Sequence, residues 1–105
     1  PTSVSVSSFT VRSGFGRVRL VWETADESEV LGFNLLRKAA QGGFEQVNAE
    51  LILATHAGLA QGAMYARPDY GLMPGMVTYR LEAVALDGTR QIVGEVTVSV
   101  GASRK

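Results

Sequence analysis

The first residue to consider for acid–base or nucleophilic chemistry is His56, the only histidine, because a Ser–His–Asp arrangement would have to use it. It lies in residues 54–58, a run of small residues that is typical of a loop. No Gly-x-Ser-x-Gly sequence precedes a helical pattern, so the nucleophile elbow of hydrolases is absent. We therefore expect an exposed loop histidine, and we predict that the chain is not an enzyme and uses no cofactor.

A second candidate for chemistry is the acidic stretch of residues 23–29, because oxygen-rich loops bind calcium. Asp26, Glu27 and Glu29 are the candidate ligands. Their spacing does not match the Asp-x-Asp-x-Asp-Gly calcium loop. The other interpretation is that residues 25–30 form a short helical turn between two strands, in which Asp and Ser side chains satisfy backbone amides. The spacing favours this structural interpretation.

Aromatic side chains could form a platform for sugars. Trp22, Phe33 and Tyr79 occupy inward-facing positions of strand patterns, and Phe9 is expected to be buried as well. The others are left for loops and the surface: Phe15, Phe44, Tyr65 and Tyr70. A flat stacking surface usually has a tryptophan outside the core, and this chain has only one tryptophan. Glycan binding is therefore kept as an alternative only.

Composition excludes several classes of function. The chain has 105 residues, 46% of them hydrophobic, which suits one globular domain. Ten basic and ten acidic residues are interleaved without a basic block, so we predict no nucleic-acid binding. Cysteine is absent, which excludes disulfides and thiolate metal sites. No apolar run approaches the ~20 residues of a membrane span. We expect no membrane insertion, and a small-molecule ligand is not expected either.

Alternation of apolar and polar residues with a period of two is the dominant structural signal. It is clearest in residues 17–23, 77–85 and 95–100, each of which predicts a half-buried strand. The predicted core residues are Val18, Leu20, Trp22, Phe33, Leu35, Leu72, Tyr79, Leu81, Val96 and Val98.

Near the N-terminus the alternation changes phase. Val4 and Val6 share one parity, whereas Phe9 and Val11 share the other. Such a change reverses the buried face unless a bulge or kink at residues 7–8 absorbs it. It is also the pattern of an edge strand that crosses from one sheet to the other.

Turn residues separate these strands and indicate the fold class. Glycines at residues 13–16 and 41–43 favour tight turns, and Asp87-Gly88 predicts a two-residue hairpin. Shorter strands are expected at 33–38, 44–48 and 63–67, with a less certain one at 51–54. Turn signals every ~10 residues without a helical face predict an all-β, two-sheet antiparallel β-sandwich of about seven strands. Residues 1–105 would be one domain, with 1–2 and 101–105 as flexible ends or linker stubs.

These motifs resemble the fibronectin type III family. Trp22 fits the core tryptophan of that family, and Leu72-Met73-Pro74-Gly75 followed by Tyr79 resembles its Leu-x-Pro turn and tyrosine corner. Tyr79 follows Leu72 by seven residues, where the family pattern has six. The resemblance implies an immunoglobulin-like topology and a corner hydrogen bond from Tyr79.

The chain most resembles a bacterial variant of that domain that is attached to secreted and cell-surface proteins. The matching phrases are residues 22–25, residues 29–35 with Arg37, and residues 79–84 running into 86–88. The resemblance implies an extracellular, non-catalytic accessory module that acts as a spacer or docking domain. Its partners would be neighbouring domains of the same polypeptide or copies of itself. The alternatives are a self-assembling surface-layer or filament subunit and a glycan- or calcium-binding module.

Overall fold

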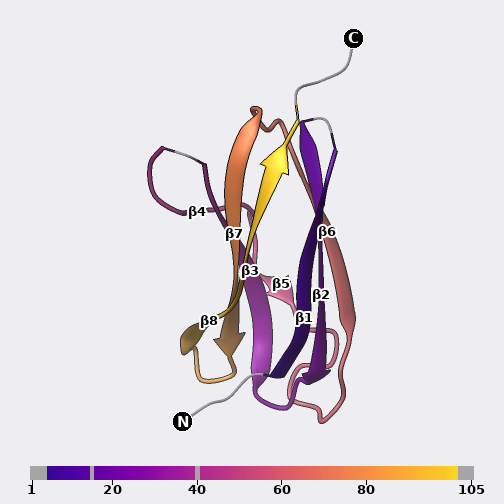
Figure 1. Ribbon diagram of the computed structural model, residues 1–105. Coiled ribbons are helices and arrows are strands. Elements are labelled where there is room, and N and C mark those ends of the chain that lie inside the picture. Colours follow the sequence, from indigo (N-terminus) through magenta and orange to yellow (C-terminus); the bar gives the residue numbers. More distant parts are fainter. Residues whose placement is uncertain (1–4, 15, 40, 102–105) are drawn as a thin grey trace.

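The computed structural model describes residues 5–14, 16–39 and 41–101, and these residues form strands and turns without a helix (Figure 1). Among them, therefore, no helix is present that could cross a membrane. The strands are β1 (Ser5–Ser13), β2 (Arg17–Asp26), β3 (Val30–Lys38), β4 (Glu45–Gln46), β5 (Ile52–Leu53), β6 (Met64–Tyr70), β7 (Gly75–Ala85) and β8 (Arg90–Val100).

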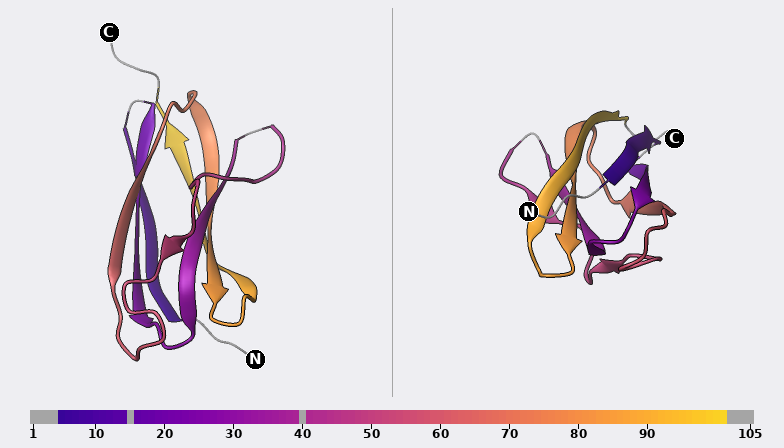
Figure 2. Two further views of the ribbon diagram at one scale, coloured as in Figure 1. Left: turned by 180° about the vertical axis from the view of Figure 1, so that it is seen from behind. Right: turned by 90° about the horizontal axis from the view of Figure 1, so that it is seen from below.

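Two antiparallel sheets pack face to face, which confirms the predicted β-sandwich (Figure 2). One sheet has the order β1-β2-β6, and the other has the order β4-β3-β7-β8, with β5 also paired to β3. The structure has one strand more than the seven predicted; β5 corresponds to the short segment expected at residues 51–54. It pairs only two residues of β3, which is why its sequence signal was short.

The molecule is elongated, with principal extents of 47 × 24 × 20 Å, and the long strands follow the long axis (Figure 1). We call the end with the β1–β2 hairpin and the β6–β7 connection the upper end; there the Leu72 amide donates to Gly16 O at 3.0 Å. The β2–β3 and β7–β8 turns meet at the lower end, where the Leu86 amide donates to Glu29 O at 3.0 Å. β1 starts at the lower end and β8 finishes at the upper end.

The core lies between the sheets and follows from the period-two pattern, because alternate residues of each strand face inward. Its buried members are Val18, Leu20, Trp22, Val30, Phe33, Leu35, Ile52, Ala54, Tyr65, Val77, Tyr79, Leu81, Ala83 and Val100. Three other residues predicted for the core are only partly buried and pack against its margin: Leu72, Val96 and Val98. They lie in a connection or on the edge strand β8, which has a hydrogen-bonded neighbour on one side only.

A bulge in β1 absorbs the phase change near the N-terminus. Val6 pairs with Thr24 and Ser8 pairs with Glu23, so Ser7 is the additional residue. Val6 and Phe9 therefore both pack against the core in spite of their opposite parity. The predicted crossing to the second sheet is wrong for the described residues, since β1 pairs with β2 along its length.

Two predicted turns are built differently. Residues 25–30 form no helical turn; the Ser28 amide donates to Asp26 Oδ1 at 2.8 Å, and the Val30 amide donates to Glu27 O at 3.1 Å. The last hairpin has a three-residue loop, residues 86–88, because the Ala85 amide donates to Thr89 O at 2.8 Å while Ala85 O accepts from the Gly88 amide at 2.9 Å. Gly88 takes the loop's left-handed position, with φ of 88°.

Candidate functional site

The three candidate calcium ligands do not converge. Glu27 is fully buried and Glu29 is exposed, while Asp26 accepts hydrogen bonds from the side chain and the amide of Ser28, which lower the pKa of its carboxyl. The described residues contain no group of three or more His, Cys, Asp or Glu side chains arranged to hold a metal. The inward turn of Glu27 has a simple cause, because the tight turn places its side chain between the sheets.

Glu27 is the acceptor at the centre of a buried cluster at the lower end. Thr24 Oγ1 donates to its Oε2 at 2.8 Å, and the Tyr65 hydroxyl donates to the same oxygen. The His56 amide donates to Oε1 at 2.7 Å. No cation among the described residues forms an ion pair with this carboxylate. Burial and the bond to Glu27 raise the pKa of Tyr65.

The same cluster fixes the connection between β5 and β6, in which residues 54–58 were expected to form a loop. Two backbone hydrogen bonds join this connection to Glu27: Gly58 N donates to Glu27 O at 2.9 Å, and Glu27 N donates to Leu59 O at 3.2 Å. The prediction that His56 is exposed is wrong, because the residue is half-buried and its Nδ1 lies 3.0 Å from Gly62 O. His56 therefore holds the loop in place, and no hydroxyl group of the described residues bonds its ring.

Asp69 is the centre of a second cluster, toward the upper end. The Tyr79 hydroxyl donates to Asp69 Oδ2 at 2.6 Å, and Arg37 Nη1 donates to both carboxylate oxygens at 2.8 and 2.9 Å. Arg37 also reaches the exposed Glu45 at 2.9 Å. Burial, followed by the bond to Asp69, raises the pKa of Tyr79. Tyr79 thus bonds a carboxylate, and this bond joins β6 of one sheet to β7 of the other.

One buried aromatic cluster underlies these polar groups. Tyr65, which the sequence left for the surface, stacks on Trp22 with ring centroids 5.2 Å apart, while Phe9 and Phe33 meet Trp22 edge to face. Tyr65 is only 6% exposed. Trp22 Nε1 is buried without a hydrogen-bond partner in the described structure, so this indole contributes through packing alone.

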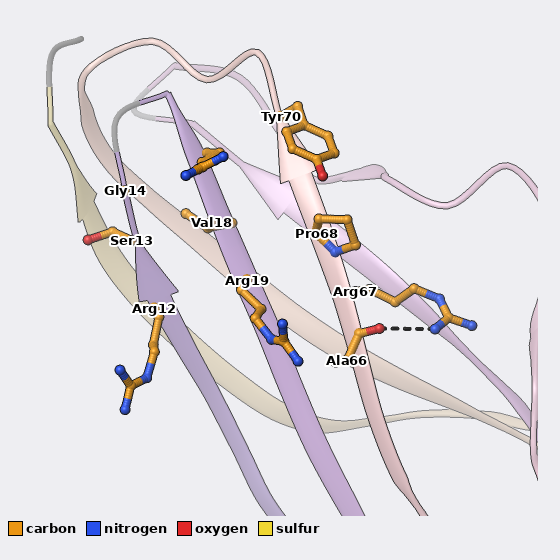
Figure 3. Close-up of a pocket in the computed structure, with 10 residues that line it drawn as sticks. Arg12, Ser13, Gly14, Val18, Arg19, Ala66, Arg67, Pro68 and Tyr70 are labelled. Carbon is orange, nitrogen blue, oxygen red and sulfur yellow. Dashed lines mark hydrogen bonds between the residues drawn. The ribbon is translucent and has the colours of Figure 1, made fainter. Parts of the chain in front are cut away.

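The surface that remains for binding is a shallow groove of about 580 Å³ on the outer side of the β1-β2-β6 sheet. Four arginines line it: Arg12, Arg17, Arg19 and Arg67. Figure 3 shows Arg12 and Arg19 extending from neighbouring strands, with Pro68 and Tyr70 on the third strand. Tyr70 is 64% exposed. We call this set of four arginines and Tyr70 the arginine surface.

Charge on the arginine surface is not compensated by carboxylates. None of its four guanidinium groups forms an ion pair within the described chain, and Arg67 donates only to Ala66 O at 3.0 Å. Arg12 and Arg19 are direct cross-strand partners. Like charges in this relation destabilise a sheet. Guanidinium groups bind carboxylate, sulfate and phosphate groups through paired hydrogen bonds, so the arrangement suits an anionic partner.

The lower end has the opposite character. Glu23, Asp26, Glu29 and Asp87 form no ion pair among the described residues. The amide and side chain of Thr89 bond Asp87 and lower the pKa of its carboxyl, so Asp87 stays ionised at neutral pH. We call these four carboxylates the acidic end. A chain of zero net charge therefore has two separated surfaces of opposite sign.

The sequence did not reveal the arginine surface, because its residues come from three strands. Arg12 and Arg19 are seven positions apart, and Arg67 is far along the chain. An available signal was the outward parity of Arg17 and Arg19 in the β2 pattern, next to a hairpin that brings Arg12 alongside. The register then placed Arg12 opposite Arg19, which no count of charges along the chain shows.

Comparison with known proteins identifies the fold. No protein-family model matches the chain, and no curated protein matches its sequence. A solved structure titled "Myokine structure" is similar over 93% of this chain and 97% of its own, with a TM-score of 0.64 and 14% identity. That neighbour has a fibronectin type III-like domain. The chain has a fibronectin type III-like fold. At this identity the likeness extends to the fold alone.

Proposed function

We propose that this chain is a non-catalytic spacer or docking module of a secreted or cell-surface bacterial protein. The observation that carries the proposal is that the buried carboxylates serve to hold the fold together. The two buried carboxylates, Glu27 and Asp69, accept structural hydrogen bonds from neighbouring strands and loops. Fibronectin type III-like folds commonly serve as structural or accessory modules, which supports the same role.

The geometry of the sandwich suits a spacer. β1 begins at the lower end and β8 finishes at the upper end, so entering and leaving segments are separated along the 47 Å axis (Figure 1). Both termini of the sandwich are held by long strand pairings, β1 with β2 and β7 with β8. A module of this kind holds its neighbours at a fixed separation.

Secretion by a bacterium rests on the phrases shared with the bacterial variant, such as residues 22–25 and 79–84. We expect the protein that contains this chain to be found outside the cell or on its surface. An antibody against the chain, applied to intact cells, culture medium and lysate of the source organism, measures this directly. Detection in the cytoplasmic fraction alone would contradict the localisation.

The spacer role is tested by exchange within the parent protein. Deleting residues 5–101 should impair the function of the neighbouring domain, and replacing them with an unrelated sandwich of similar length should restore it. If the replacement fails and charge reversal of the arginine surface causes the same loss, docking and not spacing is the role. Catalytic activity of the isolated chain would overturn the proposal.

Self-assembly is the second candidate, and the observation that favours it is the separation of charge between the two ends of the molecule. The calcium-binding alternative loses support because Glu27 turns into the core. Glycan binding in the described groove would depend on Tyr70, which is the one exposed aromatic side chain there.

A further inference from the structure

The arginine surface and the acidic end are complementary in charge and in number. Among the described residues, four arginines without a carboxylate partner lie toward the upper end, and four carboxylates without a cationic partner lie toward the lower end. The ion pairs that the described chain does form involve three other arginines, Arg37, Arg80 and Arg90. The fold has thus satisfied some charges internally and kept two opposite sets apart.

Exposed apolar side chains accompany both charged sets. At the upper end, Tyr70 and Met73 are 64% and 80% exposed. At the lower end, Leu59 and Leu86 are 54% and 50% exposed, beside the turn that contains Glu29. Interfaces commonly combine an apolar centre with a polar rim, and complementary charge sets the register between partners.

Shape and net charge favour the same contact. The arginine surface is a groove, whereas three of the four carboxylates of the acidic end lie at two turns, at residues 26–29 and 86–88, and Glu23 lies on β2. Copies of a chain with zero net charge are not kept apart by overall repulsion. Because the two surfaces are different and lie on different parts of the molecule, a contact between them is heterologous and need not close into a dimer.

We propose that the arginine surface of one copy binds the acidic end of a second copy in a heterologous contact. This inference deepens the proposed docking role and rests on it, naming the chain itself as the partner. Each copy then keeps a free surface of both kinds, so assemblies lengthen as concentration rises. The lower end spans only the 24 and 20 Å axes. That is less than the ~800 Å² per partner of a stable interface, so the association is weak and reversible.

Sedimentation velocity on the full chain tests the proposal. Over about 10 µM to 1 mM protein, the sedimentation coefficient should rise with concentration at about 20 mM salt. At about 500 mM salt it should stay at the monomer value, because screening removes attraction between exposed charges. A monomer at every concentration in low salt would overturn self-docking. It would leave the spacer role standing, since that role is tested by exchange in the parent protein.

Charge reversal identifies the surfaces. Arg12→Glu with Arg19→Glu should lower the association constant at least about tenfold, and Glu29→Arg with Asp87→Arg should do the same. An equimolar mixture of the two double variants should associate again, because a reversed surface meets a reversed end. Lys38→Glu and Glu50→Arg change exposed charges outside both surfaces and should associate like the parent.

Thermal melts accompany each variant, so that a folding defect is recognised. Single reversals, Arg19→Glu and Glu29→Arg, give the same mixing test where a double variant unfolds. Failure of folded variants to restore association on mixing would overturn the proposal. A further arm uses a sulfated polysaccharide as probe. If it binds the parent but not Arg12→Glu with Arg19→Glu, while the parent stays monomeric, the partner is a polyanion and the proposal is wrong.

Discussion

The two buried carboxylates show how one sandwich stabilises similar groups in different ways. Glu27, near the lower end, accepts bonds from two hydroxyls and an amide, all of them neutral donors. Asp69, toward the upper end, accepts from a tyrosine hydroxyl and from the guanidinium of Arg37. A hydroxyl can rotate to donate or accept, whereas a guanidinium only donates. The two clusters should therefore respond differently to the same chemical change.

The Glu27 cluster also depends on packing in a way that the Asp69 cluster does not. Tyr65, its principal donor, lies against Trp22 at 5.2 Å, and Phe33 lies against Tyr65 at the same distance. Tyr79 forms no such aromatic pair in the described structure and is tied to its position by the carboxylate and by β-sheet pairing. The lower cluster is thus an extension of the aromatic core.

The largest effect should follow Trp22→Ala, which breaks the aromatic support of the Glu27 cluster. The indole is fully buried, so its loss leaves a cavity, and we expect a cost of about 3–5 kcal/mol in the free energy of unfolding. Denaturant titration measures the cost. The rate of hydrogen exchange at the His56 backbone amide should increase by a larger factor than the rate at the Arg37 backbone amide. A variant that melts within a degree or two of the parent would show that the indole is not part of the core.

The sharpest comparison pairs Asp69→Asn with Glu27→Gln. Asp69→Asn turns an amide donor toward Arg37 and removes the charge that balances it, so we expect a cost of about 2–4 kcal/mol. Glu27→Gln keeps one oxygen for the His56 amide, and the Thr24 and Tyr65 hydroxyls can rotate to accept; we expect about 1 kcal/mol or less. Equal costs in denaturant titrations would refute the distinction between the two clusters.

Alkaline pH should weaken both clusters through their tyrosines. The pKa values of Tyr65 and Tyr79 are raised above the ordinary value of 10.0 in the folded protein. Above that pH the unfolded chain has lost protons that the folded chain still holds, so the free energy of unfolding falls as pH rises. Tyr79→Phe and Tyr65→Phe should each cost about 1–2 kcal/mol at pH 7 and flatten the decline. A decline of unchanged slope in both variants would assign it to other groups.

The smallest effect concerns calcium at the acidic end. Because Glu27 is used inside the cluster, about 5 mM calcium should shift the melting temperature by less than about 1 °C. The control is Asp26→Ala with Glu29→Ala, which should melt identically with and without calcium. A clear calcium-induced rise in the parent that this double variant loses would restore the calcium-binding interpretation.

Strand positions and the inward faces were predictable from local pattern. Residues 17–23 and 77–85 alternate so regularly that only one face could be buried, and Trp22 and Tyr79 lie on it. The strands at 44–48 and 51–54 shortened to two residues each, because they pair only with part of β3. Gly94 illustrates a contact beyond the reach of pattern: a Cβ there would lie 2.9 Å from the Phe9 ring, which packs across from β1.

The candidate site residues were harder to predict than the strands, since the expectations that failed there concerned partners distant in sequence. His56 was expected to be an exposed loop residue because its neighbours in sequence are small, and Glu27 was a candidate calcium ligand because it lies in an acidic stretch. In the structure these two residues bond each other, although they are 29 positions apart along the chain. Tyr65 was among the aromatic residues left for loops and the surface, although its strand places it directly opposite Trp22.

The sequence alone determined that this polypeptide forms two layers of strands, because the period of two in its apolar residues leaves no other way to bury them. Tertiary structure alone decided which polar groups are buried and hydrogen-bonded and which described charged groups stay exposed without an ion-pair partner. The pairing register set Arg12 beside Arg19, the packing of the two sheets brought Asp69 to Arg37, and neither outcome is encoded by neighbours in the chain. Electrostatic contacts depend on distance in space, and a β-sandwich brings together residues that are far apart in sequence.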